Sequence, residues 1–191
     1  RAGEFDRSRE ASKHRKGSRM SAEDSIPVGV VVERREIDNP WEDYTWAPVA
    51  IIPGAPPMET TDEWKELQHG DGWVHYHAGT LKLELLSGET DGYRTNLSNL
   101  QPYVYIVMTP GEEDDAAEIV PFLVTASPHE AEGYTEDSEQ IVEGVPMPPE
   151  MVAWVKEFIA KHHVEVAFKK RKRKPYDPRK SGFHGPKGPL Q

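Results

Sequence analysis

The stretch PPEMVAWVKEFIAKHHVEVAFKKRKRK, residues 148–174, decides the reading of this chain. Apolar residues three and four apart share one face of a helix. Such spacing predicts an amphipathic helix over 150–163 that packs its stripe on a core; the stripe consists of Met151, Trp154, Val155, Phe158 and Ile159. Residues 164–168 then predict a brief strand. Six consecutive basic residues follow: Lys169, Lys170, Arg171, Lys172, Arg173 and Lys174.

Charge separates the chain into an acidic body and a basic tail. Residues 20–168 hold 7 Lys/Arg against 29 Asp/Glu, whereas residues 169–191 hold 9 against 1. An acidic body repels nucleic acid and anionic membranes, so any such partner would have to meet the basic tail.

Composition predicts three segments. Residues 1–25 are too polar to bury a core and are expected to be disordered, with 1–19 of upstream or vector origin and Met20 the natural start. Residues 26–168 are expected to form a single globular domain, followed by a disordered basic tail over 169–191. The chain contains no cysteine, no apolar run long enough to span a membrane and no secretory signal pattern, so we expect a cytoplasmic protein.

Alternating and β-branched patterns predict most of the fold. Strands are expected at 28–34, 45–53, 102–109, 119–126 and 141–145, with two further pieces in 73–88 pivoting near Ala78-Gly79. A short helical turn is expected within 60–72 and a short helix is possible within 89–100. Ser127 as N-cap, followed by Pro128 and Glu130, predicts a helix over 128–135.

The resulting fold class is α+β: a largely antiparallel sheet of five to seven strands, with the C-terminal amphipathic helix and a shorter helix packed on it. A partly closed barrel is the alternative. A domain of this length buries about two-thirds of its unfolded surface, which suffices for a stable core.

Two histidines are the candidate metal ligands. His75 and His77 are two apart, so on a strand both would project from one face, and His69 could serve as a third ligand. The alternative is two half-exposed histidines at a strand end, and we expect no metal. Adjacent His162 and His163 are poor co-ligands on a helix, with His162 flanking the core face.

The remaining patterns favour no catalytic chemistry. The acidic clusters 112–115 and 136–139 lack the spacing of a calcium loop and are expected to be solvated. The chain has no glycine-rich phosphate loop, nucleophile elbow or dinucleotide fingerprint. We therefore expect no enzyme, no catalytic residues and no cofactor.

Two segments are candidate partner-binding surfaces. Trp41, Tyr44 and Trp46 gather at a turn and could anchor a protein partner, unless both Trp side chains are in the core. The basic run 169–174 could bind nucleic acid, but it lacks interleaved aromatic residues that would stack on bases. Because the body of the chain is acidic, we expect the run to contact its own domain or an acidic protein partner instead.

Three stretches, 26–57, 76–108 and 123–173, resemble a bacterial, specifically proteobacterial, domain family of unknown function. The resemblance is carried by Asn-Pro-Trp (39–41) with Trp46, by Thr-Ala-Ser-Pro-His-Glu-Ala (125–131) and by Met-Pro-Pro (147–149). It implies a small cytoplasmic protein encoded near molybdenum-dependent formate dehydrogenase, ferredoxin-like proteins and a maturation chaperone. It implies no catalytic residues, and it makes the basic run part of the domain's own pattern.

The leading hypothesis from the sequence is a non-catalytic accessory, assembly or maturation-associated protein linked to a formate-dehydrogenase-type redox enzyme. A nucleic-acid-binding protein acting through the basic tail and a metal-dependent enzyme using His75 and His77 are the alternatives.

Overall fold

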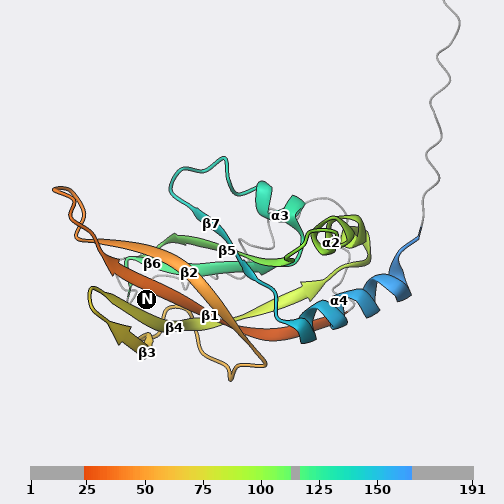
Figure 1. Cartoon of the computed structure of the whole chain (residues 1–191), viewed down its shortest axis with the longest axis horizontal. Coiled ribbons are helices and arrows are strands. Elements are labelled where there is room, and N and C mark those ends of the chain that lie inside the picture. Colours follow the sequence, from red (N-terminus) through yellow and green to blue (C-terminus); the bar gives the residue numbers. More distant parts are fainter. Residues whose placement is uncertain (1–23, 113–116, 165–191) are drawn as a thin grey trace, which may run out of the picture.

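The computed structural model describes residues 24–112 and 117–164 (Figure 1). Its elements, in chain order, are β1 (Asp24–Glu36), β2 (Tyr44–Pro53), β3 (Lys65–Gly70), β4 (Trp73–Leu85), the 3-10 turn η1 (Ser87–Glu89), α2 (Thr90–Leu97), β5 (Tyr103–Pro110), β6 (Ile119–Thr125), α3 (Pro128–Glu132), β7 (Ile141–Pro146) and α4 (Pro149–His162). The α+β class with antiparallel strands and a C-terminal helix is confirmed.

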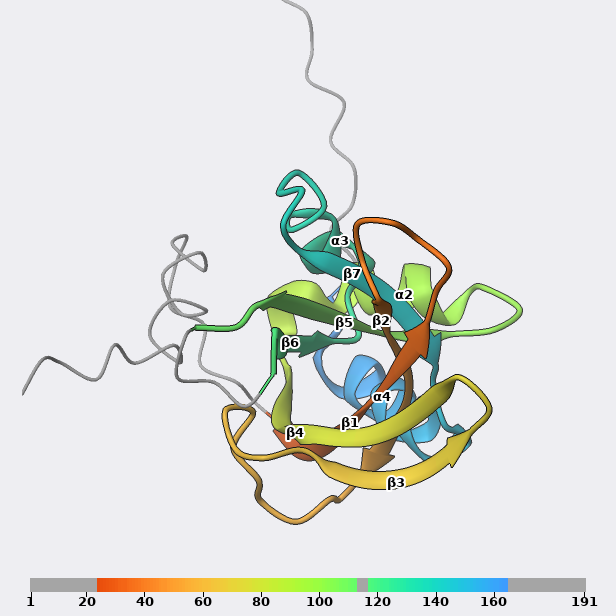
Figure 2. The ribbon, with the colours of Figure 1, turned by 90° about the vertical axis from the view of Figure 1, so that its left-hand side faces the viewer.

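The strands divide into two sheets rather than forming the single sheet expected. One sheet has the order β2-β1-β4-β3 and the other β6-β5-β7, and every pairing is antiparallel. Contacts of β4 with β6 and of β2 with β7 bring the sheets face to face, as the end-on view shows (Figure 2).

The core between the sheets explains this division. Alternate residues of β1, Val28, Val30 and Val32, are completely buried. The inner face of β5 is equally apolar; it consists of Val104, Ile106 and Met108. Since side chains alternate across a strand, each sheet has one continuous apolar face, and the two faces bury each other.

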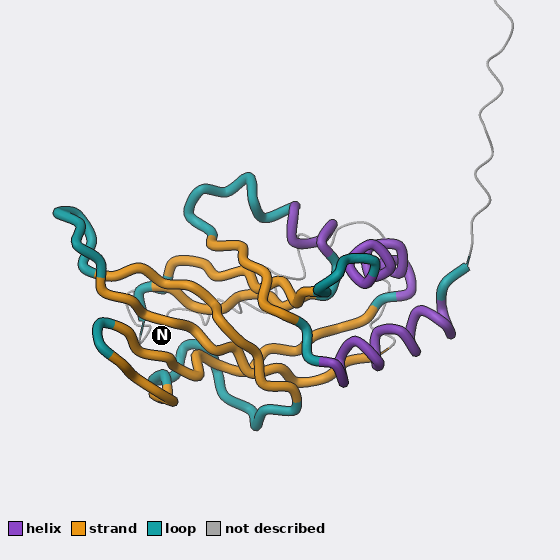
Figure 3. The backbone as a smooth tube through the Cα atoms, in the orientation of Figure 1, coloured by secondary structure: helices purple, strands orange, loops and turns teal. Residues whose placement is uncertain are grey.

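Helix α4 closes one end of this core (Figures 1 and 3). Met151, Val155 and Phe158 are buried, while Trp154 and Ile159 pack against the core from its margin. The predicted stripe is therefore confirmed. The indole Nε1 of Trp154 donates a hydrogen bond to Asp24 Oδ2 at 2.8 Å, which ties the last helix to the start of the first strand.

Asn96 fastens α2 to both β5 and β6. The side chain is fully buried, and its Nδ2 donates to the carbonyl oxygens of Tyr103 (2.7 Å) and Ala126 (2.8 Å). Its Oδ1 accepts from the Tyr103 N–H at 3.0 Å. One side chain thus partners three backbone groups, of which the Ala126 carbonyl is buried and the two of Tyr103 are partly buried.

The short helix α3 follows its predicted cap. Ser127 Oγ accepts from the Glu130 N–H at 3.4 Å and donates to Glu89 Oε2 at 3.0 Å, with Pro128 in the first helical position. The helix ends at Glu132, earlier than predicted.

The irregularity predicted at Ala78-Gly79 exists, but it does not split the strand. β4 continues through it with a register shift opposite Gly29–Val31. Gly79 has φ of 130°, and a Cβ there would lie 2.5 Å from the Thr60 Cγ2. Only glycine permits both this backbone conformation and this close approach.

The short helical turn expected within 60–72 is wrong, since residues 65–70 form strand β3. β3 pairs antiparallel with β4 at the edge of the four-stranded sheet. Its sequence, KELQHG, favours a helix locally, but it has no apolar stripe to bury one. Backbone pairing along β4 overrides the local preference.

Some predictions fall where the structure describes nothing. Residues 1–23, most of the 164–168 strand and the basic tail 169–191 lie outside the described residues. None of the helices in the described ranges is long and apolar enough to cross a membrane.

Candidate partner-binding surface

The loop between β1 and β2 forms the tip of a hairpin at the end of the molecule opposite α4 (Figure 1). Trp41 lies at this tip, and 89% of its surface is exposed. A tryptophan of this exposure buries little apolar area in its own domain. It is therefore available to a partner, and tryptophan is enriched among residues that dominate binding energy.

Local hydrogen bonds hold the tip. The Trp41 N–H donates to Asn39 Oδ1 at 3.1 Å, so the side chain of Asn39 closes a turn across Pro40. The Ile37 N–H donates to the Asp43 carbonyl oxygen at 3.1 Å and closes the loop. The sequence signal Asp-Asn-Pro marked this turn correctly.

Arg34 forms the base of the hairpin surface. Its guanidinium carbon lies 4.6 Å from the ring centroid of Tyr44 and 5.7 Å from that of Tyr76, on the neighbouring strands β2 and β4. Such cation–π contacts fix Tyr44 beneath the exposed tip. Arg34 follows Val32 on the same face of β1, beyond the buried valines.

The predicted trio of aromatic residues is split by the structure. Trp46 lies opposite Arg34 but packs edge-to-face against Trp64, with ring centroids 5.6 Å apart, and both belong to the margin of the core. Tyr44 is exposed at 36% and Trp41 at 89%. Trp46 is therefore a packing residue, and the candidate partner surface consists of Trp41, Tyr44 and the Arg34 stack.

A polar cluster occupies the opposite face of the same sheet. Glu33 accepts two hydrogen bonds from Arg35, at 2.8 and 2.9 Å, and one from His75 Nε2 at 3.0 Å. The bonds from Arg35 and then from His75 hold the pKa of the Glu33 carboxyl below its ordinary value, although burial opposes them. Bonding to Glu33 correspondingly raises the pKa of Arg35.

The structure does not assemble a metal site from the candidate histidines. His75 is bonded to Glu33, and the buried His77 has its Nε2 3.2 Å from Thr80 Oγ1. His69 lies opposite Val74 in the sheet, so it projects to the other face from His75 and instead contacts Glu66. Among the residues that the structure describes, no three His, Cys, Asp or Glu side chains are grouped to hold a metal ion.

The adjacent histidines at the end of α4 have separate surroundings. His162 stacks on Phe158 at 4.4 Å between ring centroids, which confirms its place beside the core. His163 accepts a hydrogen bond from Arg94 at Nε2 (2.7 Å), and its Nδ1 lies 3.1 Å from Thr90 Oγ1. These contacts fasten the end of α4 to α2.

Sequence reasoning missed Arg34, Tyr76 and the Glu33–His75 bond. Strand alternation could have placed Arg34 on the same face as Val32. The partners of Arg34 and Glu33, however, depend on the register between β1 and β4, which a single sequence does not reveal.

A family model describing a protein of unknown function, DUF3305, matches residues 27–173. The chain belongs to this family. The family match includes the hairpin tip and, at its end, five of the six consecutive basic residues, 169–173. The comparisons with curated proteins and with solved structures found no match.

Proposed function

We propose that the protein is a cytoplasmic, non-catalytic accessory protein of bacteria that binds a subunit or maturation factor of a formate-dehydrogenase-type redox enzyme. The observation that supports protein binding is the hairpin tip, where Trp41 is held by a closed turn and exposed to solvent. The link to formate dehydrogenase rests on the gene neighbourhood that the resemblance implies.

The geometry favours binding over a merely structural role for the tip. An exposed tryptophan on an unstructured loop would lose conformational entropy on binding, whereas this one is already ordered by Asn39 and by the Ile37–Asp43 backbone bond. Preorganisation of this kind lowers the cost of association. The proposal retains the expectation that the chain catalyses no reaction of its own.

The test is co-purification of the tagged full chain from native extract at low salt, with quantitative mass spectrometry. We expect wild type to recover subunits or maturation factors of the redox enzyme, and Trp41→Ala to lose them. The matched control is Leu100→Ala, because Leu100 is an exposed apolar residue on the loop between α2 and β5. It should recover the same proteins as wild type.

Two outcomes would overturn the proposal. Recovery of no redox-enzyme subunit or maturation factor by wild type removes the functional link. Loss of the partner on deletion of 169–191, with full retention by Trp41→Ala, assigns binding to the basic tail and excludes the hairpin tip.

A further inference from the structure

The hairpin tip combines its exposed tryptophan with an unusual density of negative charge. Residues 33–44 contain five carboxylates and two arginines. Glu33 is satisfied by Arg35 and His75. Within the described part of the chain, the other four carboxylates make no ion pair, and all are exposed: Glu36, Asp38, Glu42 and Asp43.

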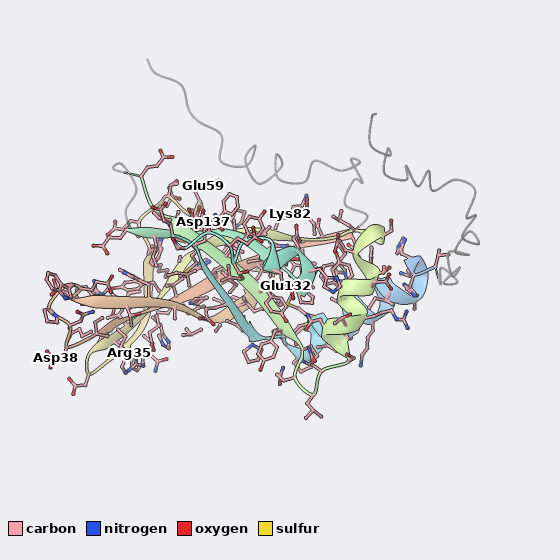
Figure 4. All side chains as sticks on the ribbon, turned by 90° about the horizontal axis from the view of Figure 1, so that it is seen from above. Arg35, Asp38, Glu59, Lys82, Glu132 and Asp137 are labelled. Atoms are coloured by element: carbon pink, nitrogen blue, oxygen red, sulfur yellow. The ribbon has the colours of Figure 1, made fainter. Side chains whose placement is uncertain are left out.

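Acidity alone does not distinguish this place, because the loop between α3 and β7 is also acidic. Glu132, the last residue of α3, is exposed, and so are Glu136, Asp137 and Glu139 in the loop that follows it. Its aromatic residue, Tyr134, packs on Phe122 with ring centroids 6.0 Å apart. Figure 4 places Asp38 at one end of the molecule, away from Glu132 and Asp137. Only the hairpin tip adds a free aromatic face to unpaired carboxylates in the described ranges.

The base of the same hairpin already contains cation–π contacts. Arg34 stacks on Tyr44 and Tyr76, so a guanidinium over an aromatic ring is stable at this end of the sheet. Trp41 presents a stronger ring for the same contact, since tryptophan binds cations best among the aromatic side chains. Carboxylates beside that ring add charge-assisted hydrogen bonds.

We propose that the hairpin tip binds a lysine- or arginine-bearing segment of the partner protein. One cationic side chain stacks on Trp41, and neighbouring cations donate hydrogen bonds to Asp38, Glu42 and Asp43. This inference rests on the proposed function and specifies the chemistry of its partner.

The chain's own basic run, 169–174, lies outside the described residues. In the described structure, α4 and the hairpin tip lie at opposite ends of the molecule (Figure 1). The basic run of a second copy is the competitor to test.

The experiment measures binding of labelled hexa-arginine and hexalysine peptides to the full chain by fluorescence anisotropy, with hexaglutamine as the uncharged probe. The charge variant is Asp38→Asn/Glu42→Gln/Asp43→Asn. Its matched control is Glu132→Gln/Glu136→Gln/Glu139→Gln, which removes the same charge from the end of α3 and the acidic loop after it.

We expect the hairpin charge variant to weaken binding of the basic peptides about tenfold, and the control variant to leave it within about twofold. Trp41→Ala should weaken hexa-arginine about two- to fivefold, as an exposed cation–π contact does. Equal weakening by both charge variants, or no effect of Trp41→Ala, would show nonspecific attraction and overturn the inference.

A measurement of self-association tests whether the basic run of a second copy occupies the hairpin tip. Light scattering of the full chain over a range of concentrations should show no Trp41-dependent dimer. A dimer that Trp41→Ala and deletion of 169–191 both abolish would assign the tip to a second copy and overturn the inference. If native extract yields a Trp41-dependent partner while the basic peptides do not bind, the proposed function stands and this inference fails.

Discussion

The two ends of this molecule differ in whether their side chains are buried or exposed to solvent. At the α4 end, Met151, Val155 and Phe158 are buried, and Asn96 satisfies three backbone groups. At the hairpin end, Trp41 and four carboxylates face solvent. Strand β1 runs through both, from buried valines to the Arg34 stack. Buried contacts thus dominate one end and exposed aromatic and acidic side chains the other, and distant sites of this kind should respond to mutation independently.

Phe158→Ala should produce the largest loss at the α4 end. Phe158 is 3% exposed and meets Tyr93 edge-to-face, with ring centroids 6.3 Å apart. Removing a buried phenylalanine ring costs about 3–5 kcal/mol of unfolding free energy, measured by urea denaturation. Lys156→Ala, on the exposed face of the same helix, should change it by less than about 0.5 kcal/mol. Equal effects of the two changes would mean that α4 does not dock as described.

Asn96→Ala should cost about 3 kcal/mol, because it removes the partner of the buried Ala126 carbonyl and of two partly buried backbone groups of Tyr103. Asn99→Ala is the control, since Asn99 is exposed just after the same helix. Amide hydrogen exchange should show faster exchange at the Tyr103 N–H in Asn96→Ala only. Unchanged exchange there would contradict the role of Asn96.

Arg34→Ala should have a smaller effect, at the hairpin end. Losing both cation–π contacts costs about 1–2 kcal/mol of unfolding free energy, and Arg34→Lys should restore part of it. Chemical shifts of the Tyr44 and Tyr76 rings should move in Arg34→Ala, while those of Tyr93 at the other end should not. A change at Tyr93 would break the independence of the two ends.

Glu33→Gln should lower stability slightly and only above acidic pH. The pKa of Glu33 is held below the ordinary glutamate value of 4.5 in the folded protein, first by Arg35. Its stabilisation is therefore present above that value and lost as the pH falls through the lower folded pKa. Urea denaturation at several pH values should show wild type and Glu33→Gln converging in acid. A constant difference down to the lowest pH would contradict the pairing.

Trp41→Ala should have the smallest effect on stability, below about 0.5 kcal/mol, because the side chain buries little surface. The same change should have the largest effect on partner recovery. Thermal melting and co-purification of one preparation compare the two properties directly. A melting temperature lowered as much as by Phe158→Ala would place Trp41 in the core and remove the contrast between the ends.

Local sequence patterns correctly predicted those elements that depend only on neighbouring residues in the chain. The helical stripe of Met151 to Ile159 and the cap at Ser127 depend only on spacing along the chain, and both are confirmed. The bulge at Gly79 was also detectable, because glycine there interrupts an otherwise regular strand.

Features that depend on pairing between distant segments could not be predicted. β3 has residues typical of a helix, and it forms a strand because its backbone pairs with β4. The Glu33–His75 bond joins residues 42 positions apart, and the same register sends His69 to the opposite face. His69, the candidate third metal ligand, is separated from His75 for this reason. The sequence gives no reason to expect different environments for Trp41 and Trp46. Trp46 is distinguished by its packing against Trp64, which is distant in the sequence.

The bond between Trp154 and Asp24 has a consequence for how the chain acquires its structure during synthesis. β1 is made first, yet it pairs with both β2 and β4, and its starting residue is held by the last helix. Contacts of such long sequence separation slow folding, because closing a long loop costs chain entropy before the contact can stabilise the structure. The nascent domain therefore keeps an open apolar end until α4 emerges, and that end is where a chaperone would act.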